Sequence, residues 1–187
     1  MDYNSIHFII PTPEDKLEHH KYERGDLLLV SYIESPYLFL YIYRSSPTTY
    51  SVYGCQDAIG ICTLLKESET IVDILDHLVA VFSDKARVID DGLARLACPG
   101  FRTTTVCRYE KEHSENGNKR GVGEPLFFTY LGLGESIYIY YNNGMYSHRY
   151  RYRFCSQGED SPVKESSELS VILEYIRVTY GPSEIII

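Results

Sequence analysis

Two short apolar runs on either side of a polar loop, within residues 92–135, constrain the fold of this chain most strongly. The first run contains the turn-forming triplet Cys98-Pro99-Gly100, and the loop at 113–123 shows no hydrophobic periodicity. β-Branched and aromatic residues are common in both runs, as is typical of strands bounded by Gly, Pro and Asn. The pattern predicts a small, strongly bent β-barrel.

Composition narrows the class of protein. Apolar residues make up 44% of the 187 positions, which is enough to form the core of one large or two small domains. The formal charge of −8 disfavours a general nucleic-acid or acidic-membrane binder, because phosphate contacts require a surplus of Lys and Arg. The 18 Tyr residues suit both strands and binding surfaces.

Five cysteines, at positions 55, 62, 98, 107 and 155, form no C-x-x-C pair and have no metal-ligand spacing. An odd count without a recognisable signal peptide predicts reduced, intracellular thiols. The apolar neighbours of Cys62, Cys107 and Cys155 predict core positions for them. The apolar run at 6–10 is too short for a membrane span. We therefore expect a soluble protein with no metal, no cofactor and no membrane partner.

Hydrophobic periodicity predicts a β-rich chain with two amphipathic helices. One helix is predicted at 69–82, started by Ser68 or Thr70, and the other at 166–178. Their apolar residues recur at helical spacing: Ile71, Ile74, Leu75, Leu78, Val79 and Phe82 in the first, Leu169, Ile172, Leu173 and Ile176 in the second. Strands are predicted at 27–33, 37–43, 49–53, 136–141 and 145–155. No internal repeat is apparent.

Several short segments of the sequence resemble the sequence pattern of extended Tudor domains. Leu93-Ala94-Arg95 and Phe101-Arg102 match the first half of the Tudor core pattern, and Phe128, Gly132 and Glu135 match the second. Residues 30–39 (V-S-Y-I-E-S-P-Y-L-F) resemble the strand pair before the linking helix of that class. The resemblance implies a β-rich α+β fold, in which a Tudor, SH3-like barrel is joined to an OB-type, staphylococcal-nuclease-like subdomain.

The resemblance also implies a division of the chain. Residues 1–24 form a loose lead-in, and residues 69–91 form the linking helix. Residues 92–144 form the Tudor barrel. The nuclease-like subdomain combines residues 25–68 with residues 145–187.

Tudor domains bind peptides, so the resemblance implies a non-catalytic interaction module. It further implies a scaffold in germline small-RNA (piRNA) silencing, in the cytoplasm or in perinuclear granules. The positions of the methylarginine cage correspond to Leu96, Phe101, Phe128, Leu131 and Leu133. Leucine has no π face, so the cation–π attraction of ~0.5–2 kcal/mol is lost there. We therefore expect a peptide partner that is recognised without methylation.

Other functions stay open on the sequence alone. They are a methylarginine-reading Tudor domain, an OB-type binder of single-stranded RNA, and an unrelated viral or host–pathogen β protein. The acidic pairs Asp90-Asp91 and Glu67/Glu69 are explained by a turn and a helix start. No catalytic residue is therefore predicted.

A basic strand is the main candidate for partner selection. Arg149, Arg151 and Arg153 alternate with tyrosines, so a regular strand places the three arginines on one face. They are expected to select acidic side chains of a peptide, or to pair with acids of a neighbouring strand. Direct contact with nucleic acid is disfavoured by the charge of −8. Further peptide-binding candidates are Tyr37, Tyr130 and Tyr138.

Overall fold

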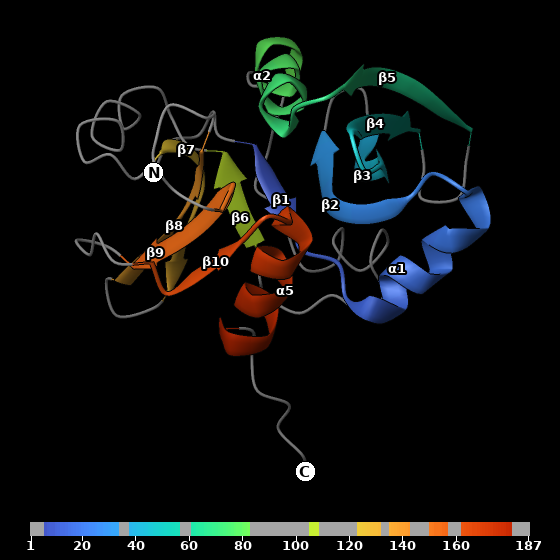
Figure 1. Cartoon of the computed structure of the whole chain (residues 1–187). Coiled ribbons are helices and arrows are strands. Elements are labelled where there is room, and N and C mark those ends of the chain that lie inside the picture. Colours follow the sequence, from blue (N-terminus) through green and yellow to red (C-terminus); the bar gives the residue numbers. More distant parts are fainter. Residues whose placement is uncertain are drawn as a thin grey trace. The chain divides into compact units, whose positions relative to one another are not determined.

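The structure is a computed structural model that describes residues 6–33, 38–56, 61–82, 105–108, 123–131, 135–142, 150–156 and 162–180. Contacts divide the chain into two units, Met1–Thr105 and Val106–Ile187. Antiparallel strands and a few helices make up both units (Figure 1), which confirms a β-rich α+β fold. Within the described residues no helix could cross a membrane, since the longest two have only 12 residues each.

The first unit is a five-stranded sheet in which consecutive strands pair antiparallel. Its strands are β1 (His7–Ile9), β2 (Asp26–Ile33), β3 (Leu38–Ser46), β4 (Thr49–Cys55) and β5 (Cys62–Ser68). Helix α1 (Pro13–His19) and the short 3-10 helix η1 (His20–Tyr22) connect β1 to β2, and helix α2 (Ile71–Phe82) follows β5. The predicted strands at 27–33, 37–43 and 49–53 correspond to β2, β3 and β4, whereas β1 and β5 were not predicted.

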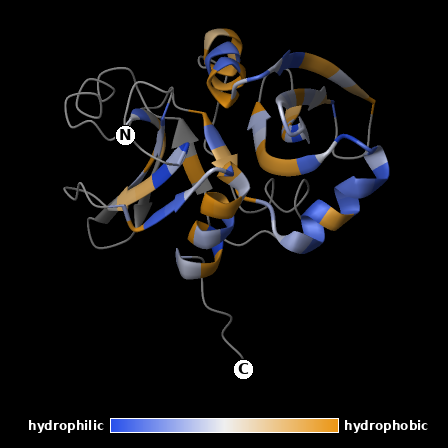
Figure 2. Cartoon of the chain, viewed as in Figure 1, coloured by the Kyte–Doolittle hydropathy of each residue, from blue (hydrophilic) through white to orange (hydrophobic). Residues whose placement is uncertain are grey.

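The prediction of a loose lead-in at 1–24 is wrong for residues 6–24, the part of it that the structure describes. Ile6, Phe8 and Ile9 are buried, and α1 begins with a capping box. The Asp15 N–H donates to Thr12 Oγ1 over 3.2 Å, and the Thr12 N–H donates to Asp15 Oδ2 over 3.2 Å. The sequence T-P-E-D carries this helix-start signal, with Pro at the first helical position. Figure 2 shows α1 as mainly hydrophilic, so its side chains add little to the core.

The helix predicted at 69–82 is confirmed as α2, and the predicted cap holds as well. The Asp73 N–H donates to Thr70 Oγ1 over 3.2 Å, and the Ser68 hydroxyl donates to the Asp73 carboxylate over 2.8 Å. Five of the six predicted apolar residues are buried: Ile71, Ile74, Leu75, Leu78 and Phe82. The amphipathic period therefore located both the helix and its packed face.

The second unit contains five described strands that also pair consecutively and antiparallel. They are β6 (Thr105–Arg108), β7 (Glu124–Leu131), β8 (Glu135–Tyr141), β9 (Tyr152–Ser156) and β10 (Lys164–Ser166), followed by helix α5 (Leu169–Tyr180). The predicted helix at 166–178 is confirmed as α5, with all four predicted residues buried. The sequence groups 145–187 with 25–68, whereas β9 and β10 pair with β8 inside this second unit.

The two units repeat one element order, which corrects the expectation of no internal repeat. Each has five consecutive antiparallel strands and then a helix of 12 residues. The sequences correspond: G-D-L-L-L-V-S-Y-I from Gly25 matches G-E-P-L-F-F-T-Y-L from Gly123. The word K-E-S recurs at Lys66 and Lys164, directly before α2 and α5. The spacing is 98 residues in each case (25 to 123, 66 to 164, 71 to 169).

Backbone geometry supports the same correspondence. Gly25 has φ +100° and Gly123 has φ +123°, and each directly precedes the second strand of its unit. A Cβ atom on Gly25 would lie 2.2 Å from the Arg44 carbonyl oxygen, and one on Gly123 would lie 2.8 Å from that of Tyr141. Only glycine tolerates this combination of positive φ and close strand approach. The chain is therefore a tandem repeat, and positions related by it are called corresponding positions below.

Candidate functional site

One face of the first sheet is lined by aromatic side chains. Alternation along β3 places Phe39, Tyr41 and Tyr43 on the same face. All three are buried, and Tyr53 of β4 lies opposite Tyr41 in the register. We call this surface the tyrosine face. It shares a hydrophobic cluster with Ile9, Leu27, Val30, Tyr32, Cys55 and Cys62.

The connection between β1 and β2 places a histidine against the tyrosine face. His19, the last residue of α1, lies with its ring centroid 4.8 Å from that of Tyr41. Its Nδ1 is 2.7 Å from the Tyr43 hydroxyl oxygen. His19 therefore joins α1 to β3 through one hydrogen bond and a ring contact.

An arginine contacts two aromatic rings next to this pair. The Arg24 guanidinium carbon is 4.7 Å from the ring centroid of Tyr22 and 4.3 Å from that of Tyr53. It is also 5.9 Å from the ring centroid of Tyr43, at the outer limit of a cation–π contact. Each such contact contributes about 0.5–1 kcal/mol at an exposed site. The half-buried Arg24 side chain is thus held in place by rings.

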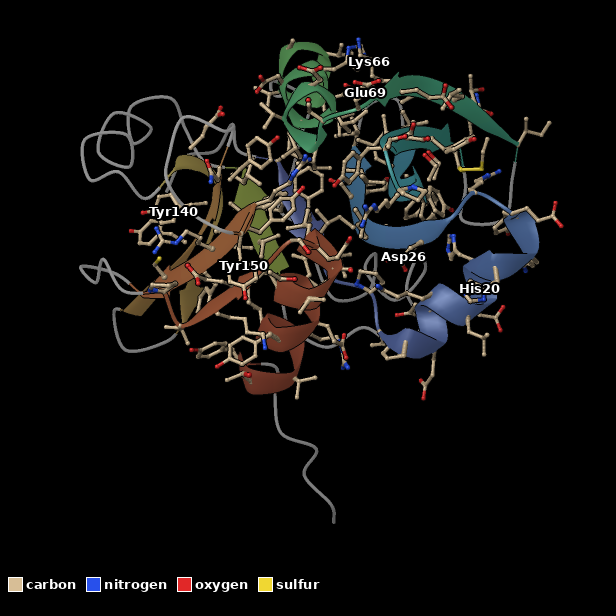
Figure 3. All side chains as sticks on the ribbon, in the orientation of Figure 1. His20, Asp26, Lys66, Glu69, Tyr140 and Tyr150 are labelled. Atoms are coloured by element: carbon tan, nitrogen blue, oxygen red, sulfur yellow. A yellow bond between two sulfur atoms is a disulfide. The ribbon has the colours of Figure 1, made fainter. Side chains whose placement is uncertain are left out.

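The backbone before β2 fixes where Arg24 lies. Glu23 has φ 54° and Gly25 has φ +100°, so Arg24 lies between two residues with left-handed backbone. Its neighbour Asp26 forms an ion pair with Lys16 of α1 over 3.2 Å. In Figure 3, the labels of His20 and Asp26 mark the two ends of this connection, beside α1 and β2. The turn and the ion pair together orient Arg24 toward the tyrosine face.

Two shifted pKa values define the protonation of the site. Burial raises the pKa of Tyr43 to about 12, although a hydrogen bond from Arg24 and its charge act in the opposite direction. Burial, followed by the positive charge of Arg24, lowers the pKa of His19. Both side chains are therefore neutral at pH 7. The Tyr43 hydroxyl and His19 Nδ1 share one hydrogen bond, and the tautomer of the neutral imidazole decides which of the two groups donates.

A second feature of the first unit is the outer strand β5. It lies at one end of the strand order, and β4 is its one strand neighbour within the described part of the chain. Leu64 is 43% exposed, and Ile61, just before the strand, is 90% exposed. Thr63, Lys66 and Glu67 are exposed as well. β5 therefore presents a seven-residue edge with apolar side chains on it.

A disulfide links β5 to the rest of its sheet. Cys55 of β4 and Cys62 of β5 are register partners and are bonded to each other, as the sulfur pair in Figure 3 shows. The expectation that Cys55 and Cys62 are reduced thiols is wrong, because the hairpin places them directly opposite each other. The expected core position is confirmed for Cys155, which is buried. Cys98 and the side chain of Cys107 are not among the parts of the chain that the structure describes.

The disulfide also shows which backbone groups face outward. The Cα atoms of Cys55 and Cys62 are 4.2 Å apart, close to the ~4.5 Å of a non-hydrogen-bonded pair. Such pairs alternate with hydrogen-bonded pairs, so Leu64 and Tyr53 form the next non-hydrogen-bonded pair. The N–H and C=O of Leu64 consequently point away from β4, toward the open edge. Beyond them Leu65 forms a bulge, since Tyr53 pairs with Leu64 and Val52 with Lys66.

The corresponding positions in the second unit differ in two ways. Pro162 corresponds to Leu64, so the second unit has no backbone N–H there. Arg153 corresponds to the buried Ser51 and lies opposite Tyr140, as Ser51 lies opposite Tyr43. Its Nε donates to the Glu165 carboxylate over 2.9 Å.

The described arginines of the predicted basic strand have different environments in the structure. Arg153 is only 7% exposed and is paired with Glu165 on β10, so it does not belong to an exposed ladder. Arg151 is exposed just before β9. The alternative of pairing with a neighbouring strand is thereby confirmed for Arg153. Arg149 lies outside the described residues.

The other predicted site residues are only partly described. Phe128, Tyr130 and Leu131 lie on β7, and their side chains are not described. Tyr138 lies half-buried on β8, with its ring centroid 6.3 Å from that of Tyr140. Leu96, Phe101, Leu133 and Tyr37 fall outside the described residues, so the cage positions stay a prediction.

His19, Tyr22 and Arg24 were not predicted as site residues, because they lie in the segment that was expected to be a loose lead-in. The signal that would have found them is the repeat: Gly25-Asp26 matches Gly123-Glu124, which makes residues 10–24 a connection between strands. Within the described residues no cluster of His, Cys, Asp or Glu has the arrangement of a metal site. Comparison with protein-family models, with curated proteins and with solved structures gave no match.

Proposed function

We propose that this chain is a non-catalytic interaction module that binds an extended segment of a partner protein along the outer edge of β5. The observation that carries the proposal is the outward-facing backbone of Leu64 on an exposed strand. An added strand forms main-chain hydrogen bonds with such an edge, and side-chain contacts then provide specificity. Leu64 and Ile61 favour an apolar residue in the partner, and Lys66 favours an acidic one.

Anchoring at both ends supports this role for β5. The disulfide fixes Cys62 to β4, and Ser68 takes part in the cap of α2. A strand held at both ends loses little conformational freedom when a partner binds. The bulge at Leu65 and the charge of Lys66 also limit unspecific pairing of this edge.

The second unit provides an internal comparison. Its outer strand β10 has three residues, against seven in β5. Proline at the position of Leu64 removes the N–H that a partner strand needs, which is a common way to protect a sheet edge. The same position is thus open in the first unit and blocked in the second.

The test follows from that comparison. Peptides are selected by display against the full chain, and their affinities are measured for the wild type, Leu64→Pro and Leu64→Ala. We expect Leu64→Pro to abolish binding, because the outward N–H is lost while the hydrogen bonds to β4 remain. Leu64→Ala keeps the N–H and should weaken binding by about tenfold or less, as loss of an exposed apolar contact does.

Hydrogen exchange provides a second readout of the same complex. The Leu64 amide should exchange more slowly with peptide bound, while the amide of Val171, exposed on α5, should not change. Undiminished peptide binding by a folded Leu64→Pro variant would show that the partner does not use this edge.

The proposal includes a Tudor-like fold for part of the second unit and a setting in small-RNA silencing, but no OB-type barrel and no cytoplasmic location. The consecutive order of β6, β7 and β8 supports a Tudor-like meander, whereas an OB barrel has a Greek-key order. The setting in small-RNA silencing is supported by the sequence resemblance alone. A cytoplasmic location is not included, because a disulfide such as Cys55–Cys62 persists mainly in oxidising surroundings.

A further inference from the structure

Arg24 is a cation for which the described part of the chain provides no carboxylate partner. The guanidinium carbon of Arg24 lies 4.7 Å from the ring centroid of Tyr22 and 4.3 Å from that of Tyr53, and these contacts hold the guanidinium plane beside the tyrosine face. That plane carries the N–H donors, which match a carboxylate in bidentate geometry. Within the described part of the chain, Arg24 forms no ion pair with a carboxylate.

The acids near Arg24 are engaged elsewhere. Asp26 pairs with Lys16 over 3.2 Å, and Glu18 pairs with Lys21 over 3.9 Å. Asp15 is buried in the capping box of α1. The positive charge of Arg24 is therefore not neutralised by these three neighbours.

Two further acidic residues of the first unit, both on the surface, are candidate partners of Arg24. Glu23 is exposed and precedes Arg24 in the left-handed turn. Glu67 is exposed on β5, at the position that corresponds to Glu165. Neither forms an ion pair with Arg24 in the structure.

In the second unit, a buried arginine beside the corresponding tyrosine is paired with a carboxylate. Beside Tyr140, which corresponds to Tyr43, Arg153 is paired with Glu165 over 2.9 Å. A guanidinium beside this tyrosine thus has its carboxylate in the second unit. In the first unit the arginine comes from the β1–β2 connection, and Glu67, at the position that corresponds to Glu165, forms no ion pair with it.

We infer that Arg24 is the anchor of a binding site for a carboxylate-bearing ligand on the tyrosine face of the first unit. The ligand carboxylate pairs with Arg24 as the Glu165 carboxylate pairs with Arg153 in the second unit. This site is independent of the β5 edge, since it uses a side chain that strand addition does not require.

An NMR titration of the full chain tests the inference, with the Nε–H signals of its arginines as the readout. Succinate is titrated at constant ionic strength, with inorganic phosphate in a parallel series. We expect the Arg24 signal to shift to saturation with succinate. The Arg177 signal is the control in the same sample, because Glu174 already binds that guanidinium through two contacts, of 2.9 and 2.6 Å.

The matched variants are Arg24→Lys and Arg177→Lys. Lysine keeps the charge but loses the planar fork, so Arg24→Lys should weaken succinate binding by about tenfold, the equivalent of one charge-assisted hydrogen bond. Arg177→Lys should leave the affinity unchanged. Parallel, non-saturating shifts of Arg24 and Arg177, saturation by phosphate alone, or full affinity in Arg24→Lys would each overturn the inference.

Discussion

His19 Nδ1 and the Tyr43 hydroxyl oxygen lie 2.7 Å apart, and this contact joins the end of α1 to the third strand of the first unit. The pair is stable as long as the imidazole is neutral. A protonated His19 would add a positive charge beside those of Arg24 and Lys21, and among the described residues Asp15 and Glu18 act in the opposite direction. The contact between α1 and the sheet should therefore depend on pH.

The first prediction is a loss of stability on acidification. The folded state lowers the pKa of His19 below its ordinary 6.5, so between pH 6.5 and that lower value the unfolded chain binds more protons. Stability is full above pH 6.5 and falls as the pH drops through the folded pKa. Thermal melting from pH 8 to 5 should show this, and His19→Gln should flatten the curve. Because burial also lowers the pKa of His7, His7→Gln is the control that separates the two histidines.

The second prediction concerns the Cys55–Cys62 disulfide. The bond joins residues seven positions apart and restricts the unfolded chain, so its loss should cost about 2–3 kcal/mol. Paired Cys55→Ser and Cys62→Ser substitutions should lower the melting temperature, and a reductant should do the same to the wild type. A melting temperature of the wild type that does not respond to reductant would contradict the prediction.

The third prediction concerns the glycines that precede β2 and β7. Gly25→Ala should destabilise by about 1–3 kcal/mol, because alanine is strained at φ +100° and its Cβ would clash with the Arg44 carbonyl. Gly123→Ala should act in the same direction, with a smaller clash at 2.8 Å. Gly54→Ala is the control, since its Cβ would meet only movable side-chain atoms of Leu65 and Leu38, at 3.0 Å and beyond. Chemical denaturation measures all three.

The fourth prediction compares two ion pairs of the second unit. Arg153–Glu165 has an arginine side chain that is only 9% exposed, whereas the side chains of Arg177–Glu174 are 21% and 41% exposed. Glu165→Gln should cost about 1–3 kcal/mol, because it leaves a buried guanidinium without its charged partner. Glu174→Gln should cost ~0.5 kcal/mol or less. Equal losses in denaturation would show that burial does not distinguish the pairs.

Helices and apolar strands were predictable from the sequence, because their signal is local. The period of Ile71, Ile74 and Leu75 located α2, and the run from Leu27 to Ile33 located most of β2. β5 was not predictable in the same way, because an exposed edge strand such as C-T-L-L-K-E-S has no alternating pattern. Its existence depends on pairing with β4, which is a tertiary contact.

The candidate site was harder to predict than the fold, because its parts come from distant segments. Arg24 is linked to Tyr53 only through the folded sheet, and Cys55 meets Cys62 only through the hairpin. Pairing of the basic strand with acids of a neighbouring strand was one of two expectations, and the sequence could not choose between them because it does not show that Glu165 lies opposite Arg153. The repeat was hidden because its spacing changes from 98 residues at Gly25 to 97 at Tyr41 and 102 at Tyr50, as the connecting loops differ in length (25 to 123, 41 to 138, 50 to 152).

The repeat allows the two units to be compared position by position within one molecule. The position of Leu64 on β5 is held by Pro162 in the second unit, where the guanidinium of Arg153 is paired with Glu165. Exchanging Leu64 and Pro162 between the two units would therefore test, inside a single chain and against an identical background, whether the binding of a partner follows the strand edge that carries the N–H group.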